Sequence, residues 1–413
     1  MKEQEFRIIE LPNGLRVAHL YVPYTPAVHC AYVINNGSRD DPRQETGMAH
    51  FIEHMVFKGT AKRKTFHILN YLESVGGDVN AYTTKEKTCY YASLSARYLD
   101  RATELLTDIT FHSVFPGKEI SKEKQVIAEE IDMYRNTPDE AIFDDFDALI
   151  FGDHRLGQPI LGTRESLVNI TQETVKNHLN QTYAAGQVVY AVVGNVTDKQ
   201  LEKVIGKYLR DLELPSGKLE RDAPSEVMGT DLTIGIATDQ AHEIIGGRAF
   251  ALRHEHYLPF LVLNNLLGGP AMGSMLNYNV RERHGLAYNI ASFFNPFVDS
   301  GQWGIYYACE EKNLPKIRRI VHHDLEELCK KPLSPVRLRQ AKNQLTGQLI
   351  LGYEQLLNQA LGVAKDLLDF GSVMPFSEYI SAIEAVSAGQ IQEVAKLVFQ
   401  DSPMRTITYL KQA

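Results

Sequence analysis

Cysteine is scarce in this chain, and what there is lies far apart. The 413 residues include four cysteines, Cys30, Cys89, Cys309 and Cys329, and no two of them form a CxxC pair. The spacing needed for a cysteine-ligated zinc ribbon is therefore missing, and no disulfide framework is implied. We expect four reduced thiols, most of them buried.

Long apolar runs and an excess of basic charge are missing as well. No stretch approaches the ~18 apolar residues of a membrane-spanning helix. Residues 1–6, MKEQEF, lack the basic segment and apolar core of a secretory signal. Lys and Arg total 43 against 51 Asp and Glu, a net charge of −8, which does not favour nucleic acid or anionic lipid as a partner. We therefore expect a soluble, cytoplasmic protein that binds neither nucleic acid nor membranes.

The first half of the chain alternates strand-like and helix-like segments. Pro12-Asn13-Gly14 marks a hairpin turn between two β-rich runs, at residues 6–11 and 15–21. Further strands are predicted for residues 27–34, 78–95 and 188–193. Helices are predicted for residues 47–57, 65–75, 99–111, 121–135 and 171–182.

The second half repeats this order after a polar segment. Residues 214–230, LPSGKLERDAPSEVMGT, have the composition of a linker. Strands are then predicted for residues 231–252, 288–308 and 404–410, and helices for 257–267, 314–329, 335–351 and 388–398. We expect an α+β fold in which two homologous domains, 1–213 and 231–413, arose by internal duplication. Each would pack helices on a mainly antiparallel sheet. Two unrelated α/β domains remain the alternative.

The most specific pattern is His50-Phe51-Ile52-Glu53-His54, within GMAHFIEHMVFKGT. Residues four apart share one face of a helix, so His50 and His54 can present two imidazoles to one zinc ion. Glu53 lies near the same face and can accept a proton from a water at the site. The order is HxxEH, the reverse of HExxH. Chance is the alternative, but the neighbouring methionines and phenylalanines make this helix largely apolar, where unpaired polar groups are costly.

A hydrolytic zinc site needs a third protein ligand and an open position. In ISKEKQVIAEEIDMYRN, Glu123 and Glu130 fall within the apolar stripe of a helical wheel. That stripe consists of Val126, Ile127, Ile131, Met133 and Tyr134. A carboxylate on the core side of a helix needs a partner or a metal. Glu130 is thus the better ligand, Glu123 a candidate partner of a ligand, and Glu129 a solvated side chain.

With these residues the chain resembles the pitrilysin-like metallopeptidases, the group that contains insulin-degrading enzyme and the mitochondrial processing peptidase. Its length is similar to that of the short bacterial and processing-peptidase β members. The family places a zinc-binding glutamate some 76 residues after the last motif histidine, and the step from His54 to Glu130 matches this. A family glutamate seven residues earlier maps to Glu123. The resemblance implies a zinc endopeptidase with one Zn²⁺ per subunit and with Glu53 and Glu123 in catalysis.

Two further segments resemble substrate-binding parts of the family. The pattern of residues 76–91, GGDVNAYTTKEKTCYY, taken alone predicts a hairpin. The resemblance implies instead a substrate-binding edge strand at Asn80 and Ala81. Arg281 and Tyr288 map to a family pair that binds substrate and stabilises the oxyanion. Without the resemblance, Arg281 would read as a surface cation. The glycine turn at residues 268–274 lacks the Ser-Arg pair often seen in the family, which leaves the substrate preference open.

Family enzymes enclose substrate between two halves of two domains each, and this chain resembles one half. The resemblance therefore implies a homodimer that cleaves peptides or unfolded segments inside a chamber, with Arg281 and Tyr288 acting on the partner's zinc site. Two other classes stay open: a catalytically silent scaffold subunit and a metal-dependent hydrolase of non-peptide substrates.

Overall fold

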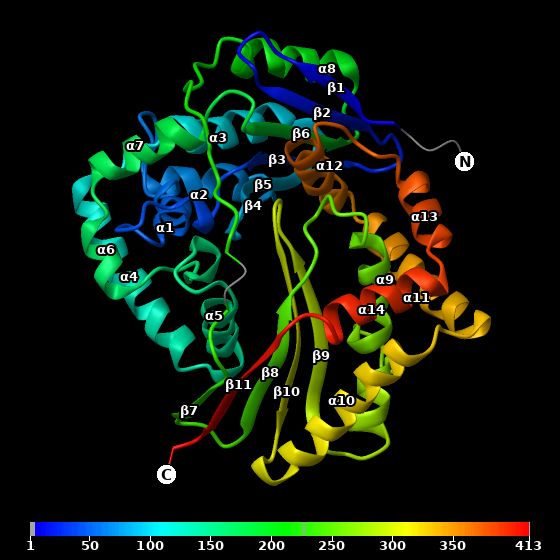
Figure 1. Ribbon diagram of the computed structural model, residues 1–413. Helices are drawn as coiled ribbons and strands as arrows, with labels where there is room; N and C mark the ends of the chain where they lie inside the picture. The colour runs from blue at the N-terminus through cyan, green and yellow to red at the C-terminus, as the bar shows by residue number, and fades with distance from the viewer. Residues whose placement is uncertain (1–4, 226–227, 413) are drawn as a thin grey trace. The chain divides into compact units, whose positions relative to one another are not determined.

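The structure, a computed structural model, describes residues 5–225 and 228–412 (Figure 1). The chain folds into two compact units. Unit 1 combines the chain up to residue 131 with residues 158–221 and 351–375, and unit 2 combines residues 132–157 and 222–350 with the chain from 376 onward. Each unit contains one β-sheet with helices on both faces (Figure 1).

The sheet of unit 1 has six strands. Their spatial order is β1 (Arg7–Glu10), β2 (Arg16–Tyr21), β6 (Val188–Gly194), β3 (Ala27–Ile34), β5 (Thr88–Ser95) and β4 (Asp78–Thr83). Only the β2–β6 pair is parallel. The hairpin predicted around Pro12-Asn13-Gly14 is confirmed, because β1 and β2 pair antiparallel and Gly14 takes a positive φ of 81° in the turn. β4 lies at the edge of the sheet.

The sheet of unit 2 repeats this topology without the first strand. Its order is β7 (Leu232–Ile236), β11 (Met404–Lys411), β8 (Ala241–Arg248), β10 (Gly301–Cys309) and β9 (Ala287–Pro296). The first pair is again parallel and the other three pairs are antiparallel. The same order and directions in both sheets confirm the predicted α+β fold and support an internal duplication.

Most helices of unit 1 share one core with one face of its sheet. They are α1 (Met48–Met55), α2 (Thr65–Glu73), α3 (Leu99–Phe111), α4 (Gly117–Arg135), α7 (Gln172–Thr182) and α8 (Asp198–Val204). In unit 2 the equivalent layer contains α9 (Tyr257–Gly268), α10 (Leu314–Lys330), α11 (Pro335–Tyr353), α13 (Phe376–Ala385) and α14 (Ala388–Phe399). The short helix α6 (Arg164–Asn169) precedes α7.

The opposite face of each sheet is covered by a helix from the other half of the sequence. α12 (Leu356–Phe370) packs its alanines, valine and leucine on β2, β6 and β3 of unit 1. α5 (Pro138–Phe151) does the same in unit 2, against Ile244, Tyr306 and Ile407. The units are therefore not the contiguous stretches 1–213 and 231–413. The apolar face of α5 or α12 shows that the helix must be buried, but its periodicity does not say on which sheet.

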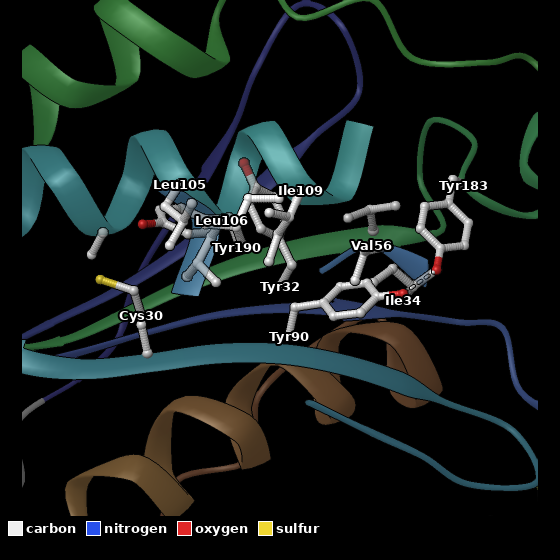
Figure 2. Close-up of a cluster of buried hydrophobic side chains, with 14 of the residues drawn as sticks. Cys30, Tyr32, Ile34, Val56, Tyr90, Leu105, Leu106, Ile109, Tyr183 and Tyr190 are labelled. Atoms are coloured by element: carbon white, nitrogen blue, oxygen red, sulfur yellow. Dashed lines mark hydrogen bonds between the residues drawn. The ribbon is translucent and has the colours of Figure 1, made fainter. Parts of the chain in front are cut away.

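Three tyrosines form a row across the middle of the unit 1 sheet. Tyr32 of β3 stands opposite Tyr90 of β5 on one side and Tyr190 of β6 on the other. All are fully buried under α3 (Figure 2). Each hydroxyl has a partner: Thr107 for Tyr32, Thr103 for Tyr190 and Tyr183 for Tyr90, at 2.8–2.9 Å. The buried hydroxyls are thus all paired, and those of Tyr32 and Tyr190 hold β3 and β6 against α3.

Two smaller expectations, on the cysteines and on the linker, agree with the structure. All four cysteines are free and buried, as predicted. Residues 214–225 and 228–230 lie in neither helix nor strand, as expected of a linker, while residues 226 and 227 lie outside the described part. In the part of the chain that the structure describes, no helix combines the length and apolar character needed to cross a membrane.

Candidate metal centre and active site

The helix that carries His50 and His54 begins on a buried carboxylate. Gly47 precedes α1 with a φ of 92°, and a side chain there would collide with the carbonyl oxygen of Leu161. Asp41 accepts hydrogen bonds from the backbone N–H of Gly47 and of Ala49, at 2.7 and 2.9 Å. A carboxylate at the N-terminus of a helix accepts hydrogen bonds from N–H groups that have no partner within the helix. Its negative charge also interacts favourably with the positive end of the helix dipole. Asp41 thus fixes the start of α1.

His50, His54 and Glu130 converge at one point in unit 1. Their potential ligand atoms all lie within 4.8 Å of one another. His54 Nε2 is 3.5 Å from Glu130 Oε2, and His50 Nε2 is 3.9 Å from Glu130 Oε1. Tetrahedral zinc with bonds of about 2.0–2.1 Å separates its ligand atoms by about 3.3 Å. The donor set and its spacing therefore fit a zinc ion. Among the described residues, no other group of His, Cys, Asp or Glu converges in this way.

The other nitrogen of His54 is held by Glu123. His54 Nδ1 lies 2.9 Å from Glu123 Oε1, and Lys58 Nζ lies 2.8 Å from Glu123 Oε2. The carboxylate favours the tautomer with the proton on Nδ1, which leaves Nε2 free to bind a metal. Burial acts to raise the pKa of Glu123, but the hydrogen bonds from His54 and Lys58 outweigh it and lower the pKa. Glu123 is thus an ionised outer partner of His54.

His50 is kept neutral by its surroundings. Burial, and then the neighbouring His54, lower the pKa of His50 to about 3. Its Nδ1 is buried and has no hydrogen-bond partner among the described residues. A neutral imidazole is the form that binds a metal, so no proton has to leave His50 at neutral pH.

Glu53 is held in place by a residue that was not predicted from the sequence as part of the site. Thr83, at the end of β4, donates a hydrogen bond to Glu53 Oε2 at 2.5 Å. Burial raises the pKa of Glu53; the Thr83 hydrogen bond and the nearby His54 oppose this, and Glu130 adds to it. A carboxylate with a raised pKa is suited to accept a proton near neutral pH. No sequence motif indicates a role for Thr83, Lys58 or Asp41. Only the fold places them next to the residues of the candidate site.

The helix α4 differs in part from the predicted wheel. Glu123 and Ile127 are buried and Glu129 is exposed, as expected, but Val126 and Met133 are 47% and 64% exposed. The prediction of one broad buried stripe was therefore wrong. Val126, Glu130 and Met133 follow each other at helical spacing, a quarter turn away from Ile127. The face with Glu130 meets the two histidines instead of the core.

The edge strand β4 carries Asn80 and Ala81. On one side, Asn80 and Ala81 pair with Tyr91 and Tyr90 of β5. On its other side no described strand pairs with it. Asn80 Oδ1 accepts a hydrogen bond from the Ala81 N–H at 2.8 Å. β4 therefore combines an unpaired edge with Thr83, the residue that holds Glu53.

Comparison with known proteins decides the family. Residues 16–164 match the family described as "Insulinase (Peptidase family M16)", and residues 169–345 match the family described as "Peptidase M16 inactive domain". A Bacillus subtilis protein named zinc protease YmxG is 33% identical over 392 residues, which cover 94% of each chain. The chain belongs to peptidase family M16. A zinc protease of Rickettsia felis is 31% identical and covers 97% of this chain and 96% of its own.

Solved structures share the M16 fold along the whole chain. The M16 inactive domain from Pseudomonas fluorescens has a TM-score of 0.90 at 18% identity, covering 99% of this chain and all of its own. A Helicobacter pylori protease has a TM-score of 0.87 at 22% identity, covering 98% and 100%. At these identities the likeness concerns the fold, so the chemistry of this M16 chain has to be argued from its own residues.

The remaining two predicted residues belong to unit 2. Arg281 is in the last turn of the short helix η5 (Asn277–Glu282), Gly285 follows with a φ of 58°, and Tyr288 is the second residue of β9. Tyr288 therefore lies at the start of the strand predicted from residue 288. Tyr288 is 83% exposed, and Arg281 has a 3.8 Å ion pair with its neighbour Glu282. The convergent cluster in unit 1 includes neither of them.

We expect Glu123→Gln to weaken zinc binding by about 10- to 100-fold, the usual cost of losing an outer partner of a metal ligand. The amide leaves Lys58 without its carboxylate and holds the His54 tautomer less firmly. Competition with a chromogenic chelator measures the affinity. Glu119→Gln is the matched control, because it removes the same charge from α4 where the partner is the exposed Lys122. Equal affinities in the two variants would contradict this role.

Proposed function

We propose that this M16 chain is a zinc-dependent endopeptidase with one Zn²⁺ per subunit. The observation that carries the proposal is the convergence of His50, His54 and Glu130 next to a carboxylate, Glu53, that Thr83 holds in place. Two imidazoles and one carboxylate are a donor set typical of hydrolytic zinc sites, which keep one position open. The four free, buried cysteines are in keeping with a reducing compartment, and we place the enzyme in the cytoplasm.

The side chains of unit 1 divide the chemistry among them. Zinc bound by His50, His54 and Glu130 would polarise the scissile carbonyl and lower the pKa of the attacking water. Glu53 accepts the proton of that water and returns it to the leaving amine. Thr83 occupies Oε2 of Glu53, so Oε1 is the atom that receives the proton. Glu123 keeps the Nδ1 proton of His54 in place throughout.

The unpaired edge of β4 supports peptides as the substrate class. An extended peptide can add to an unpaired strand through main-chain hydrogen bonds, whatever its side chains. Ala81 would provide these main-chain bonds on the same strand as Thr83, with the Asn80 side chain beside it. The Ala81 N–H is now bonded to Asn80, so a peptide has to displace that side chain. A segment can pair in this way only if its backbone is extended and free, so the edge favours flexible peptides and unfolded segments over folded proteins.

The test of the proposal is hydrolysis of a quenched-fluorescence peptide library by the zinc-loaded protein. We expect cleavage that stops with a chelator and returns with zinc, and internal cuts in the products. If the protein binds zinc but cleaves no peptide, the endopeptidase assignment is wrong. The hypothesis of a catalytically silent scaffold subunit would then be favoured. Hydrolysis confined to non-peptide esters or amides would instead support a different hydrolase class.

We further propose that the enzyme works as a homodimer whose chamber encloses the substrate. Arg281 and Tyr288 of one subunit would bind substrate and stabilise the oxyanion at the partner's zinc site. The exposure of Tyr288, with no hydrogen-bond partner among the described residues for its hydroxyl, leaves that donor available. A cation and a phenol are suitable groups for a developing negative charge.

Co-expression of two inactive chains tests this arrangement. A Glu53→Gln chain and an Arg281→Ala chain should each be nearly inactive as homodimers. A mixed dimer would have one site lacking both groups and one intact site. Since about half of the dimers are mixed, activity should recover to roughly a quarter of wild type. If purified mixed dimers are no more active than the two variants alone, Arg281 does not act across the interface.

A further inference from the structure

The turn between β4 and β5 is unusual for its buried charges. Lys85, Glu86 and Lys87 are consecutive, and each is less than a tenth exposed. Charged residues in a hairpin turn are normally solvated, and burying them requires close partners. The turn immediately follows Thr83, the residue that holds Glu53. Whatever fixes this turn therefore also fixes the partner of the proposed general base.

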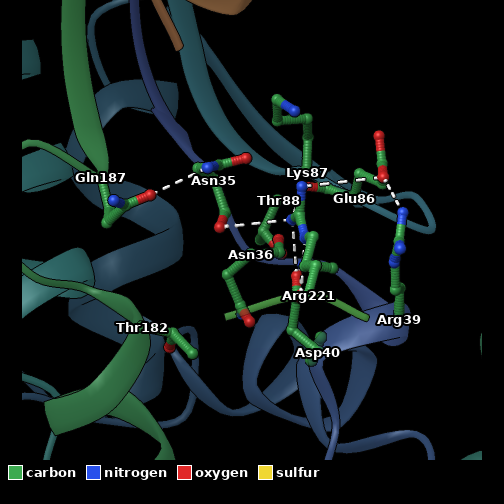
Figure 3. Close-up of polar contacts among 12 residues, drawn as sticks. Asn35, Asn36, Arg39, Asp40, Glu86, Lys87, Thr88, Thr182, Gln187 and Arg221 are labelled. Atoms are coloured by element: carbon green, nitrogen blue, oxygen red, sulfur yellow. Dashed lines mark hydrogen bonds and ion pairs between the residues drawn. The ribbon is translucent and has the colours of Figure 1, made fainter. Parts of the chain in front are cut away.

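Each of the three charged side chains has a partner in unit 1. Arg39 donates to Glu86 Oε1 at 2.6 Å (Figure 3). Lys87 pairs with Asp369, near the end of α12, at 2.6 Å. Lys85 Nζ donates to the Gln158 carbonyl at 2.6 Å. The turn is thus held from three separate segments of the chain.

The loop before α1 packs directly on the turn. Ser38 and Arg39 donate backbone hydrogen bonds to the carbonyls of Thr84 and Lys85, at 3.1 and 2.8 Å. At Gly37 a Cβ atom would lie 2.4–2.5 Å from the backbone of residues 84–86, so no side chain fits there. Asp41, in the same loop, fixes the start of α1. One short loop therefore connects the histidine helix to the strand that positions Glu53.

Arg221 ties this loop and the turn together. Its Nε and Nη2 donate to the two carboxylate oxygens of Asp40, at 2.8 and 2.7 Å, and Nη2 also donates to the Glu86 carbonyl at 3.0 Å (Figure 3). The side chains of Arg221 and Asp40 are 9% and 1% exposed. Arg221 comes from the otherwise irregular linker and is the last residue of unit 1 along that segment. A planar guanidinium is the one side chain that can make this forked contact.

We propose that Arg221 is a positioning residue for catalysis: by binding Asp40 and the Glu86 carbonyl it fixes the β4–β5 turn, and through Thr83 it fixes Glu53. The inference rests on the proposed peptidase function. Removing Arg221 leaves the buried carboxylate of Asp40 without its cation, which is costly, and the turn and loop would separate to hydrate it. A shift of about 1 Å at a catalytic group can cost up to 10²-fold in rate.

The first experiment compares Arg221→Met with Arg63→Met. Arg63 is a matched control: it is also largely buried and pairs with two acidic residues, Glu104 and Asp108, but it does not contact the turn. We expect kcat of Arg221→Met to fall by about 10-fold or more, with KM and zinc content unchanged, and kcat of folded Arg63→Met to stay near wild type. Arg221→Lys, which keeps the charge without the fork, should show a smaller loss and replaces the Met variant if that one does not fold.

The second experiment is a double-mutant cycle with Thr83→Val. If Arg221 acts through Thr83, the double variant should be no slower than Thr83→Val alone, whereas independent effects would multiply. Gly37→Ala disturbs the turn without changing charge and should lower kcat in the same non-additive way. Unchanged kcat in Arg221→Met, or fully multiplicative effects with Thr83→Val, would overturn the proposal. An inactive wild-type enzyme would instead contradict the proposed function itself.

Discussion

Glu53→Gln should abolish peptide hydrolysis while zinc stays bound. The amide keeps the shape of the side chain and can still accept the hydrogen bond from Thr83, but it cannot accept a proton from water. Loss of a general base costs about 10²–10⁴-fold, so kcat should fall by at least about 10²-fold. Steady-state hydrolysis of a quenched peptide and metal analysis by atomic absorption measure the two quantities on the same preparation.

The structure also predicts that this variant stays folded. Burial raises the pKa of Glu53, so replacing the carboxylate with a neutral amide removes a charge that the site holds at some cost. Glu73→Gln, on the exposed side of α2, is the control for the loss of one negative charge. Turnover near the wild-type rate in the Glu53 variant would rule out its role as the general base.

The fold was predictable from sequence where the residue pattern of a segment is compatible with only one kind of element. β6 is buried along its whole length, and its run of valines has the composition of a central strand. The hairpin at Gly14 and the helix that ends before Gly76 have turn residues that mark their limits. The places of α5 and α12 were not predicted, because their patterns, rich in phenylalanine or leucine, determine only that a face is buried. The exchange of these helices between sheets is set by long-range packing, which no local pattern encodes.

The site divides in the same way. His50, Glu53 and His54 lie within five residues of one helix, so their convergence follows from helical spacing alone. Glu130 required the additional argument that a carboxylate within the apolar stripe of a helix needs a partner or a metal. Thr83 and Arg221 could not be found, because a threonine in a strand and an arginine in a polar linker are unremarkable until the fold places them beside Glu53 and Asp40. Glu123, the outer partner of His54, was within reach of the sequence because it lies on the same helix as Glu130; the sequence does not indicate positioning residues that come from other segments of the chain.

Glu130→Gln and Glu129→Gln should differ sharply in zinc retention, although both remove one negative charge from adjacent positions of α4. Glu130 lies 3.5 Å from His54 Nε2 and 3.9 Å from His50 Nε2, whereas Glu129 is exposed. Loss of a ligand should cost more than the 10- to 100-fold typical of an outer partner, so we expect the Kd for zinc to rise by more than about 10²-fold in Glu130→Gln and to stay unchanged in Glu129→Gln. Dialysis against graded chelator concentrations, followed by metal analysis, measures the difference. Hydrolysis by Glu130→Gln should return only partly in excess zinc, because an amide oxygen is a weaker ligand than a carboxylate. If both variants lose zinc at the same chelator concentration, the loss of zinc is due to the change in charge near the site, and Glu130 is not the third ligand.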